Sequence, residues 1–169
     1  MRTDNKGRTI FDLQSTAFEF AVELEKHFNY FASVPDSVYN KVLDHLKHWE
    51  YPSRENHAIA MAFGAHLAGH KPCVLIQNSG LGLCIDALLG TFRLYNQGLM
   101  MVVTNRGILE WEEVQHQDWG AITSDLLSAC QIPIISFNEK GLAGIKMAAE
   151  IVNKNGIVVL LIERGNINE

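Results

Sequence analysis

A short turn, Asn78-Ser79-Gly80-Leu81-Gly82, directly follows the apolar residues 74–76 and Gln77. Two glycines and two small polar side chains after a buried strand allow the backbone to approach a ligand where a helix begins. The spacing is not that of a dinucleotide fingerprint, because Ile85 occupies the place of the third glycine, nor of a P-loop or a nucleophile elbow. The turn is therefore either a tight strand-to-helix connection or a backbone platform for a ligand.

Two titratable residues could do acid–base chemistry near such a turn. Glu55 opens a helix of small residues, where the helix dipole favours a carboxylate. It is either a surface cap or, if partly buried, a group that accepts and returns a proton. His116 lies in the polar segment 112–119, within a loop predicted over 105–118. Its alternative interpretation is a histidine exposed to solvent.

The seven histidines raise the question of a metal site. His45 and His48 are three residues apart, and His66 and His70 are four apart, but Gly69 is expected to end the helix before His70. No carboxylate or cysteine completes either pair into a ligand set. No metal ligand is therefore predicted in this chain.

Composition limits the class of protein. A chain of 169 residues, with a hydrophobic fraction of 47%, is expected to form one domain over 1–169. The net charge of −5, with scattered Lys and Arg, argues against nucleic-acid binding. The three cysteines form no CxxC pair, which is typical of reduced thiols and predicts a cytoplasmic protein. Neither a secretory signal nor an apolar run of membrane-spanning length is recognisable, so no membrane association is expected.

Strands and helices are predicted to alternate along the chain. The apolar runs predict strands, and the helical spacing predicts helices that begin with one whose Phe18, Val22 and Leu24 face the core. Asp36 or Ser37 is expected to cap the second helix. The predicted strands are 28–34, 49–52, 73–77, 99–104, 132–137 and 156–163, and the predicted helices are 15–26, 36–48, 55–68, 81–95, 119–130 and 139–153.

Strands that are apolar on both faces predict an α/β fold of three layers, a parallel sheet with helices on both faces. Ligands of such folds bind at the carboxyl ends of the strands. Polar segments fall at those ends, and this pattern predicts the site there. They are Pro35-Asp36-Ser37, residues 53–56, Asn78-Ser79-Gly80 and the loop 105–118.

Three segments together resemble the flavodoxin-like pyrimidine-binding domain of thiamine diphosphate decarboxylases. They are residues 54–62 (RENHAIAMA), residues 64–69 (GAHLAG) and residues 77–82 (QNSGLG). The strongest resemblance is to phosphonopyruvate decarboxylase and the alpha subunit of sulfopyruvate decarboxylase, over residues 16 to 164. A "VP" turn at residues 33–37 and Gln115-His116 leading into residues 122–127 also match this group.

The resemblance implies a chemistry for these residues. In this family the glutamate that matches Glu55 hydrogen-bonds N1′ of the cofactor's aminopyrimidine, which prepares the thiazolium carbon to lose its proton. Catalytic roles are thus implied for Glu55 and His116, and cofactor contacts for Glu55 and the turn, Asn78, Ser79, Gly80, Leu81 and Gly82. Substrate contacts are implied for Pro35, Asp36, Ser37 and His116, with Asn105 and Arg106 as further donors for an anionic group. Asp36 departs from the family pattern, in which Cys or another small residue is often found.

The family also implies a partner. No Gly-Asp-Gly motif, which holds Mg²⁺ with the diphosphate in this family, occurs in the chain. The resemblance therefore predicts a hetero-oligomer with a diphosphate-binding beta subunit that carries this motif and Mg²⁺. The predicted substrate is a small anionic 2-keto acid, with 3-phosphonopyruvate favoured over sulfopyruvate. Decarboxylation of another 2-keto acid, a non-catalytic partner-binding domain and a flavodoxin-like ligand-binding domain remain as alternatives.

Overall fold

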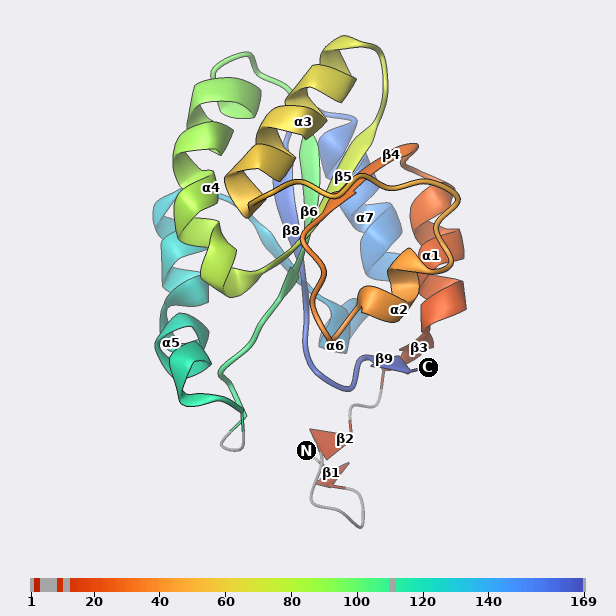
Figure 1. Ribbon diagram of the computed structural model, residues 1–169, viewed down its shortest axis with the longest axis vertical. Helices are drawn as coiled ribbons and strands as arrows, with labels where there is room; N and C mark the ends of the chain where they lie inside the picture. Colours follow the sequence, from red (N-terminus) through yellow and green to blue (C-terminus); the bar gives the residue numbers. More distant parts are fainter. Residues whose placement is uncertain (1, 4–8, 11–12, 110–111, 169) are drawn as a thin grey trace.

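A five-stranded parallel sheet forms the centre of the computed structural model, which describes residues 2–3, 9–10, 13–109 and 112–168. The strands, in spatial order, are β4 (Tyr30–Ser33), β5 (Pro72–Gln77), β6 (Leu99–Thr104), β8 (Ile157–Ile162) and β7 (Ile134–Ser136). Leu75 pairs with Val102, and Val102 pairs with Leu160 across the middle of the sheet. All strands run the same way, so their carboxyl ends share one edge (Figure 1).

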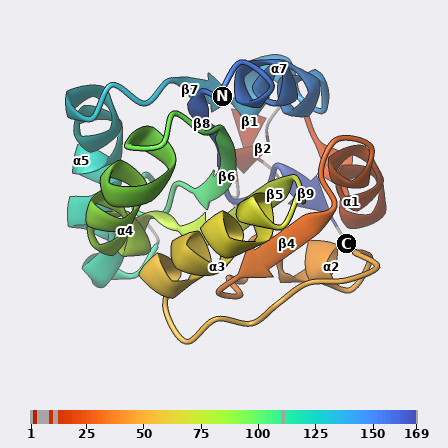
Figure 2. The same cartoon turned by 90° about the horizontal axis from the view of Figure 1, so that it is seen from above.

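Helices cover both faces of the sheet (Figure 2). One layer contains α1 (Ala17–Glu25), α2 (Asn40–Leu43), α6 (Phe137–Lys140) and α7 (Ala143–Val152). The other contains α3 (Glu55–Leu67), α4 (Leu81–Leu88) and α5 (Val114–Ala129), with the 3₁₀ turn η1 (Asn78–Gly80) before α4 and the π-helix η2 (Leu89–Arg93) after it. The predicted three-layer α/β fold is confirmed.

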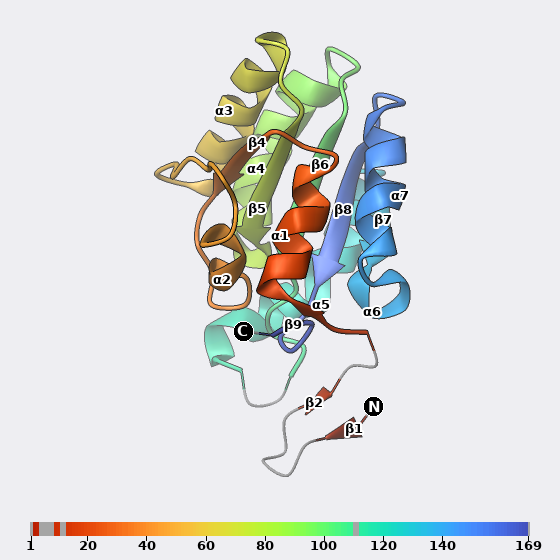
Figure 3. The ribbon, with the colours of Figure 1, turned by 90° about the vertical axis from the view of Figure 1, so that its right-hand side faces the viewer.

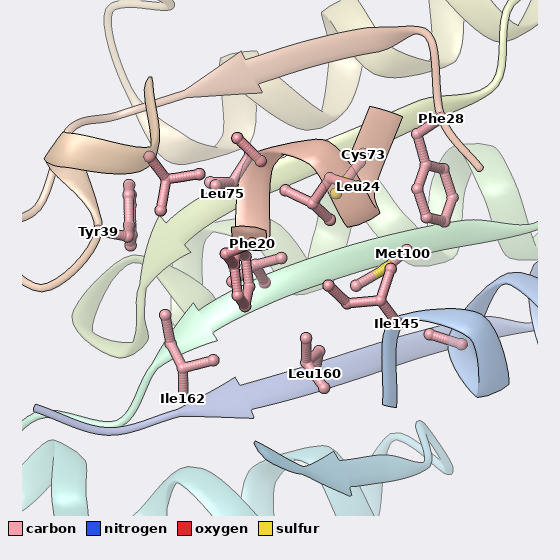
Figure 4. Close-up of a cluster of buried hydrophobic side chains, with 14 of the residues drawn as sticks. Phe20, Leu24, Phe28, Tyr39, Cys73, Leu75, Met100, Ile145, Leu160 and Ile162 are labelled. Atoms are coloured by element: carbon pink, nitrogen blue, oxygen red, sulfur yellow. The ribbon is translucent and has the colours of Figure 1, made fainter. Parts of the chain in front are cut away.

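Each strand contributes alternate side chains to two separate cores. Cys73, Leu75 and Met100 pack with Phe20 and Leu24 of α1 on one face (Figure 4). Their sequence neighbours point to the opposite face and pack against α3, α4 and α5, namely Val74, Ile76, Met101 and Val103. Because both faces are buried, the strands are continuous apolar runs rather than alternating ones.

Two short strand pairs lie outside the main sheet. β3 (Ser15–Thr16) pairs in parallel with β9 (Ile167–Asn168), and β1 (Arg2–Thr3) pairs antiparallel with β2 (Thr9–Ile10). The first pair brings the start of α1 beside the end of the chain, at the carboxyl edge of the sheet (Figure 3). No strand was predicted at these residues, since two-residue strands carry no periodic signal.

The predicted orientation of α1 is partly wrong. Phe18 and Val22 are exposed, at 59% and 38%, whereas Ala17, Phe20, Ala21 and Leu24 are buried. The helix carries two apolar stripes, and packing against the sheet selects the one with two small alanines. Leu24 faces the core as predicted.

Other boundaries differ from the prediction for local reasons. The segment 36–48 holds only the four-residue helix α2, whose N-cap is Tyr39, so the cap predicted at Asp36 or Ser37 is wrong. The Asp36 carboxylate instead accepts the N–H of Val38 in the turn that precedes the helix. Residues 49–52 form a single bridge, between Glu50 and Ala32, instead of a strand. The helix predicted over 139–153 is divided by Gly141, which has a φ of +54°.

None of the helices in the described part of the chain is long and apolar enough to cross a membrane.

Candidate functional site

The carboxyl edge of the sheet collects most of the predicted site residues (Figure 3). Residues 35–37 follow β4, the turn 78–82 follows β5, and residues 105–109 follow β6. Parallel pairing of these three strands places the segments next to one another. The sequence prediction of a site at this edge therefore corresponds to a real cluster of side chains.

Glu55 lies directly against the backbone of Gly80. A Cβ atom added at Gly80 would lie 2.2 Å from Cγ and 2.4 Å from Cδ of Glu55. Glu55 is half-buried at the first position of α3, and its carboxylate has no hydrogen bond or ion pair with any residue that the structure describes. Gly80 is thus required by the close approach of a carboxylate that remains available for another partner.

Buried side chains of the turn itself, Asn78 and Leu81, fix its position. The Asn78 side chain is fully buried, and its amide donates to the carbonyl of Arg106 at 2.9 Å and to Thr123 Oγ1 at 3.0 Å. Leu81 is also fully buried, in the core beneath α4. Asn78 therefore ties the turn to the neighbouring loop and to α5. Ser79 is half-buried and Gly82 is exposed.

His116 does not lie in a loop, because α5 begins at Val114. The whole residue is only 8% exposed, so the interpretation as a solvent-exposed histidine is wrong. The helix start was missed because the buried stripe of α5 is His116, Thr123 and Leu127, which contains only one apolar residue. The ring nitrogen Nδ1 of His116 lies 2.9 Å from Nε2 of Gln77.

Gly107 positions the first turns of α5. Its φ is +86°, and an added Cβ would lie 1.8 Å from the carbonyl oxygen of His116. Gly120 lies against the same loop, since its Cβ would be 2.4 Å from the carbonyl oxygen of Gly107. The two glycines allow the loop after β6 to pack closely on the helix that carries His116.

A buried ion-pair group, which we call the Arg106 cluster, joins two of the segments at this edge. Arg106 donates from Nη1 to Asp36 at 2.9 Å, from Nε to Glu112 at 2.6 Å and from Nη2 to Glu113 at 3.0 Å. The side chains of Arg106, Asp36 and Glu112 are 6%, 4% and 1% exposed. Burial alone would lower the pKa of Arg106, but its bonds to Glu112 and the charge of Asp36 raise this pKa overall.

The predicted substrate residues around Asp36 have different environments. The Asp36 carboxylate is occupied by Arg106 and by the N–H of Val38, and is not free at the surface. Pro35 and Ser37 are exposed, and Ser37 Oγ accepts from Nη2 of Arg164 at 3.1 Å. Arg106, suggested as a donor for an anion, already pairs with three carboxylates. Asn105, the other suggested donor, is buried, with 8% of the residue exposed.

The half-buried Glu163 and the buried Cys84 also have shifted pKa values. Burial raises the pKa of Glu163 at the end of β8, against the opposing effect of hydrogen bonds from Asn138 and Asn105, and nearby Glu112 raises it further. Burial, with the charge of Glu55 as a second cause, raises the pKa of the Cys84 thiol to about 12. Cys84 therefore stays protonated near neutral pH, and all three cysteines are free.

The histidines outside this site form no metal centre in the described ranges, where no group of three potential ligands occurs. His66 instead pairs through Nε2 with Oε1 of Gln97, at 2.8 Å. This pair lies at the opposite edge of the sheet, where α3 ends and β6 begins.

The sequence interpretation missed three contributors to the site. Gln77 was read as the last residue of a strand, Glu112 as a loop residue, and Gly107 was not considered. A polar residue ending an apolar strand, as Gln77 does, is a usable signal, because ligands of parallel sheets bind there. Glu112 carried no such signal, since only the fold brings it to Arg106.

Several known proteins are similar to this chain. The "Sulfopyruvate decarboxylase subunit alpha" of Methanothermobacter thermautotrophicus is 38% identical over 82 residues, 48% of this chain and 49% of that protein. The protein of the same name from Methanococcus maripaludis is 30% identical over 118 residues, 67% of this chain and 71% of its own length. A "Phosphonopyruvate decarboxylase" of Streptomyces viridochromogenes is 37% identical over 81 residues, 47% of this chain and 20% of that protein.

The fold has a counterpart among solved structures. A 2-oxoglutarate:ferredoxin oxidoreductase from Magnetococcus marinus superposes with a TM-score of 0.63 and 18% identity, over 90% of this chain and 29% of that one. No family model matches the sequence. The match spans about half the length of the first relative, and more than two thirds of the Methanococcus protein. The chain belongs to the thiamine diphosphate-dependent decarboxylase family of sulfopyruvate decarboxylase alpha subunits and phosphonopyruvate decarboxylases.

Proposed function

We propose that this chain is the alpha subunit of a thiamine diphosphate-dependent decarboxylase, and that its Glu55 activates the cofactor. One observation carries the proposal: a half-buried carboxylate, without a partner among the described residues, is held against a glycine at the carboxyl edge of a parallel sheet. An acid–base group needs such a place, partly shielded from water and free to bond a ligand. A mere surface cap would not require the missing side chain at Gly80.

The residues present fit the aminopyrimidine end of thiamine diphosphate. Glu55 would hold a proton at N1′ of the ring, while the backbone of Ser79, Gly80 and Gly82 would form the adjoining wall. Bound there, the cofactor supplies a sink for the electrons that are released when CO₂ leaves a 2-keto acid. Asn78 and Leu81 would support this wall from the protein interior, Asn78 through its hydrogen bonds and Leu81 through its packing in the core.

The proposed substrate is a small 2-keto acid with a second anionic group. The alpha-subunit relatives favour sulfopyruvate, which would give sulfoacetaldehyde and CO₂. The Streptomyces relative and the Gln115-His116 pair support 3-phosphonopyruvate, which would give phosphonoacetaldehyde, as the second candidate. We assign contact with the anionic group to Ser37 and His116, together with Pro35 and the loop that Asp36 anchors.

A partner subunit completes the proposed enzyme. The described residues offer no acidic group suited to Mg²⁺, and the chain has no Gly-Asp-Gly motif, so Mg²⁺ and the diphosphate are assigned to a beta subunit that carries it. The assembly is a hetero-oligomer in which each active site lies between two chains. The pyrimidine-binding unit is assigned to residues 1–169.

The first experiment compares the lone chain with the assembled pair. The chain is purified alone and with a Gly-Asp-Gly-bearing partner, and CO₂ release is measured with sulfopyruvate, phosphonopyruvate and pyruvate in the presence of thiamine diphosphate and Mg²⁺. Activity should appear only on mixing and should saturate at a fixed ratio of the chains. Turnover by the lone chain, or none by the pair with any of these keto acids, would contradict the proposal.

A substitution at Glu55 tests the role of the carboxylate. Glu55→Gln keeps the size of the side chain but removes the group that holds the proton, so turnover of the assembled enzyme should fall by about 10²- to 10⁴-fold. Cofactor affinity, measured by calorimetry, should change much less. Turnover near that of the wild type would show that Glu55 does not have this role.

A further inference from the structure

Gln77 and His116 form a side-chain pair at the carboxyl end of β5. Gln77 is the last residue of this strand, and His116 is in the first turn of α5. The amide nitrogen Nε2 of Gln77 lies 2.9 Å from Nδ1 of the ring. Gln77 is half-buried and His116 is buried, so the protein shields much of this contact from water.

The second ring nitrogen of His116 has a different environment. Nε2 lies 3.7 Å from Oε2 of Glu113, beyond hydrogen-bond distance, and the Glu113 side chain is 63% exposed. The His116 side chain itself is 10% exposed. One edge of the ring therefore contacts Gln77, and the other edge lies nearest the exposed carboxylate of Glu113.

The backbone around this ring is held as well. Gly107 packs against the carbonyl of His116, and Asn78 bridges the loop after β6 to α5 through Arg106 and Thr123. These contacts fix the backbone from which the ring projects, so the ring starts from a set position beside Gln77. Gln77 is thus placed to determine which nitrogen of the ring carries the proton.

We propose that Gln77 is a positioning residue that fixes the neutral ring of His116 in the tautomer with its proton on Nε2. An amide N–H that donates to Nδ1 requires a lone pair there, so the single proton of the neutral imidazole lies on Nε2. His116 then presents an N–H donor on the side of the exposed Glu113, from which an anionic keto acid would enter. Only this last step rests on the proposed function.

The tautomer can be observed directly in the full-length chain. Histidine is labelled with ¹⁵N, and the ring-nitrogen signals are recorded at a pH where the rings are neutral, with His116→Asn used to identify the signals of His116. Wild-type His116 should show a protonated Nε2 and an unprotonated Nδ1. A proton on Nδ1 in the wild type would overturn the proposal without any variant at Gln77.

Two variants test whether Gln77 causes this state. Gln77→Leu removes the donor at similar size, so the two tautomers should mix. Gln77→Glu replaces the donor with an acceptor, so the proton should move to Nδ1. Unchanged His116 signals in both variants would show that Gln77 does not set the tautomer.

The Gln97–His66 pair provides a matched control. It has the same residue types at a similar distance, 2.8 Å, but lies away from the proposed site. Gln97→Leu should change only the signals of His66 and should leave those of His116 unchanged. A change at His116 in Gln97→Leu would mean that the signals report a general disturbance, and would overturn the assignment to Gln77.

Activity of the assembled pair adds a separate measurement. Gln77→Leu and Gln77→Glu should lower kcat by about 10- to 100-fold, less than loss of an acid–base group itself, while Gln97→Leu should not. Wild-type kcat in Gln77→Glu, with the proton moved to Nδ1, would overturn the positioning role. If the spectra are as expected but the wild-type pair does not decarboxylate any of the keto acids, the proposed function is refuted. The control of the tautomer by Gln77 is then still established.

Discussion

At the scale of single residues, the contact between Glu55 and Gly80 links the sequence pattern to the site. The two residues are 25 positions apart, on α3 and on the turn before α4. The glycine was interpreted from sequence as either a tight turn or a platform for a ligand. The structure adds a third reason, because the space of the missing Cβ is filled by the side chain of Glu55.

Gly80→Ala should therefore displace the Glu55 side chain. The added methyl group would overlap Cγ and Cδ, and overpacking of this kind costs about 1–3 kcal/mol of stability. Turnover of the assembled pair should fall together with stability. Urea unfolding and steady-state rates measure the two effects.

A double substitution separates this clash from a general effect of the turn. In a Glu55→Ala background the overlap with Cγ and Cδ is gone and only the contact with Cβ, at 2.8 Å, remains, so Gly80→Ala should cost clearly less stability than in the wild type. Gly64→Ala is the control for adding a methyl group, since its Cβ would meet nothing within 4 Å, and it should gain stability by up to about 1 kcal/mol. Equal costs in both backgrounds would show that the contact with Glu55 is not the cause.

At the scale of elements, the Arg106 cluster connects the turn after β4 with the loop after β6. In this cluster Arg106 forms ion pairs with the buried carboxylates of Asp36 and Glu112. Buried charges of this kind are stable only while they are paired. The cluster therefore serves to hold the two loops together beside the turn 78–82.

Arg106→Leu should be strongly destabilising. Removal of the guanidinium leaves the buried Asp36 carboxylate without its ion-pair partner and leaves Glu112, among the described residues, with only the longer ion-pair contact to Arg164, at 3.6 Å. Breaking a buried pair of this kind costs about 3–5 kcal/mol. Arg93→Leu is the matched control, because Arg93 is exposed and its change should stay within about 0.5 kcal/mol. Chemical unfolding of the two variants gives the comparison, and similar stabilities would show that the cluster contributes little.

Glu163, at the end of β8, should make stability depend on pH. Burial raises its pKa above the usual 4.5, so the folded chain binds this proton more tightly than the unfolded chain does. Its contribution to the free energy of unfolding therefore falls as pH rises through 4.5 toward the folded-state pKa. Below 4.5 both states are protonated and the contribution is constant.

Glu163→Gln tests this dependence while it keeps an oxygen that can accept from Asn138, as Oε2 does now at 2.7 Å. The variant should gain stability relative to the wild type as pH is raised from about 4 to about 7, with no change of the difference at lower pH. Urea unfolding at a series of pH values measures it. A difference that stays constant over the whole range would contradict the raised pKa.

At the scale of the whole molecule, the layer of α3, α4 and α5 is the candidate surface for a partner. Both α3 and the turn 78–82 flank the proposed site and belong to this layer. Leu83 on α4 is 45% exposed, beside the exposed Gly82. We expect a partner that completes the site to contact this layer.

Leu83→Arg should weaken assembly with the beta subunit without unfolding the chain, because a bulky charge would lie in the contact surface. Met147 on α7 is 41% exposed on the opposite layer, so Met147→Arg is the matched control and should assemble normally. Analytical ultracentrifugation of each variant with the partner measures the complex. Equal assembly by both variants would place the interface elsewhere.

The sequence alone determined the layered α/β fold and the edge of the sheet where the polar residues gather. These predictions succeeded because strands buried on both faces must be continuously apolar, and because the carboxyl ends of parallel strands share one edge of the sheet. The residues of the segments 54–62, 64–69 and 77–82 also sufficed to indicate the family. All of these features depend on local pattern or on residue order.

Only the tertiary structure decided which side chains meet at that edge. The pairing of Gln77 with His116, of Asp36 with Arg106 and of Glu55 with Gly80 depends on contacts between segments that are 39, 70 and 25 residues apart. The burial of His116 in a helix likewise follows from the close packing of Gly107 on α5. Periodicity reports which face of an element is apolar, whereas a contact between polar side chains is fixed by how the elements pack against one another.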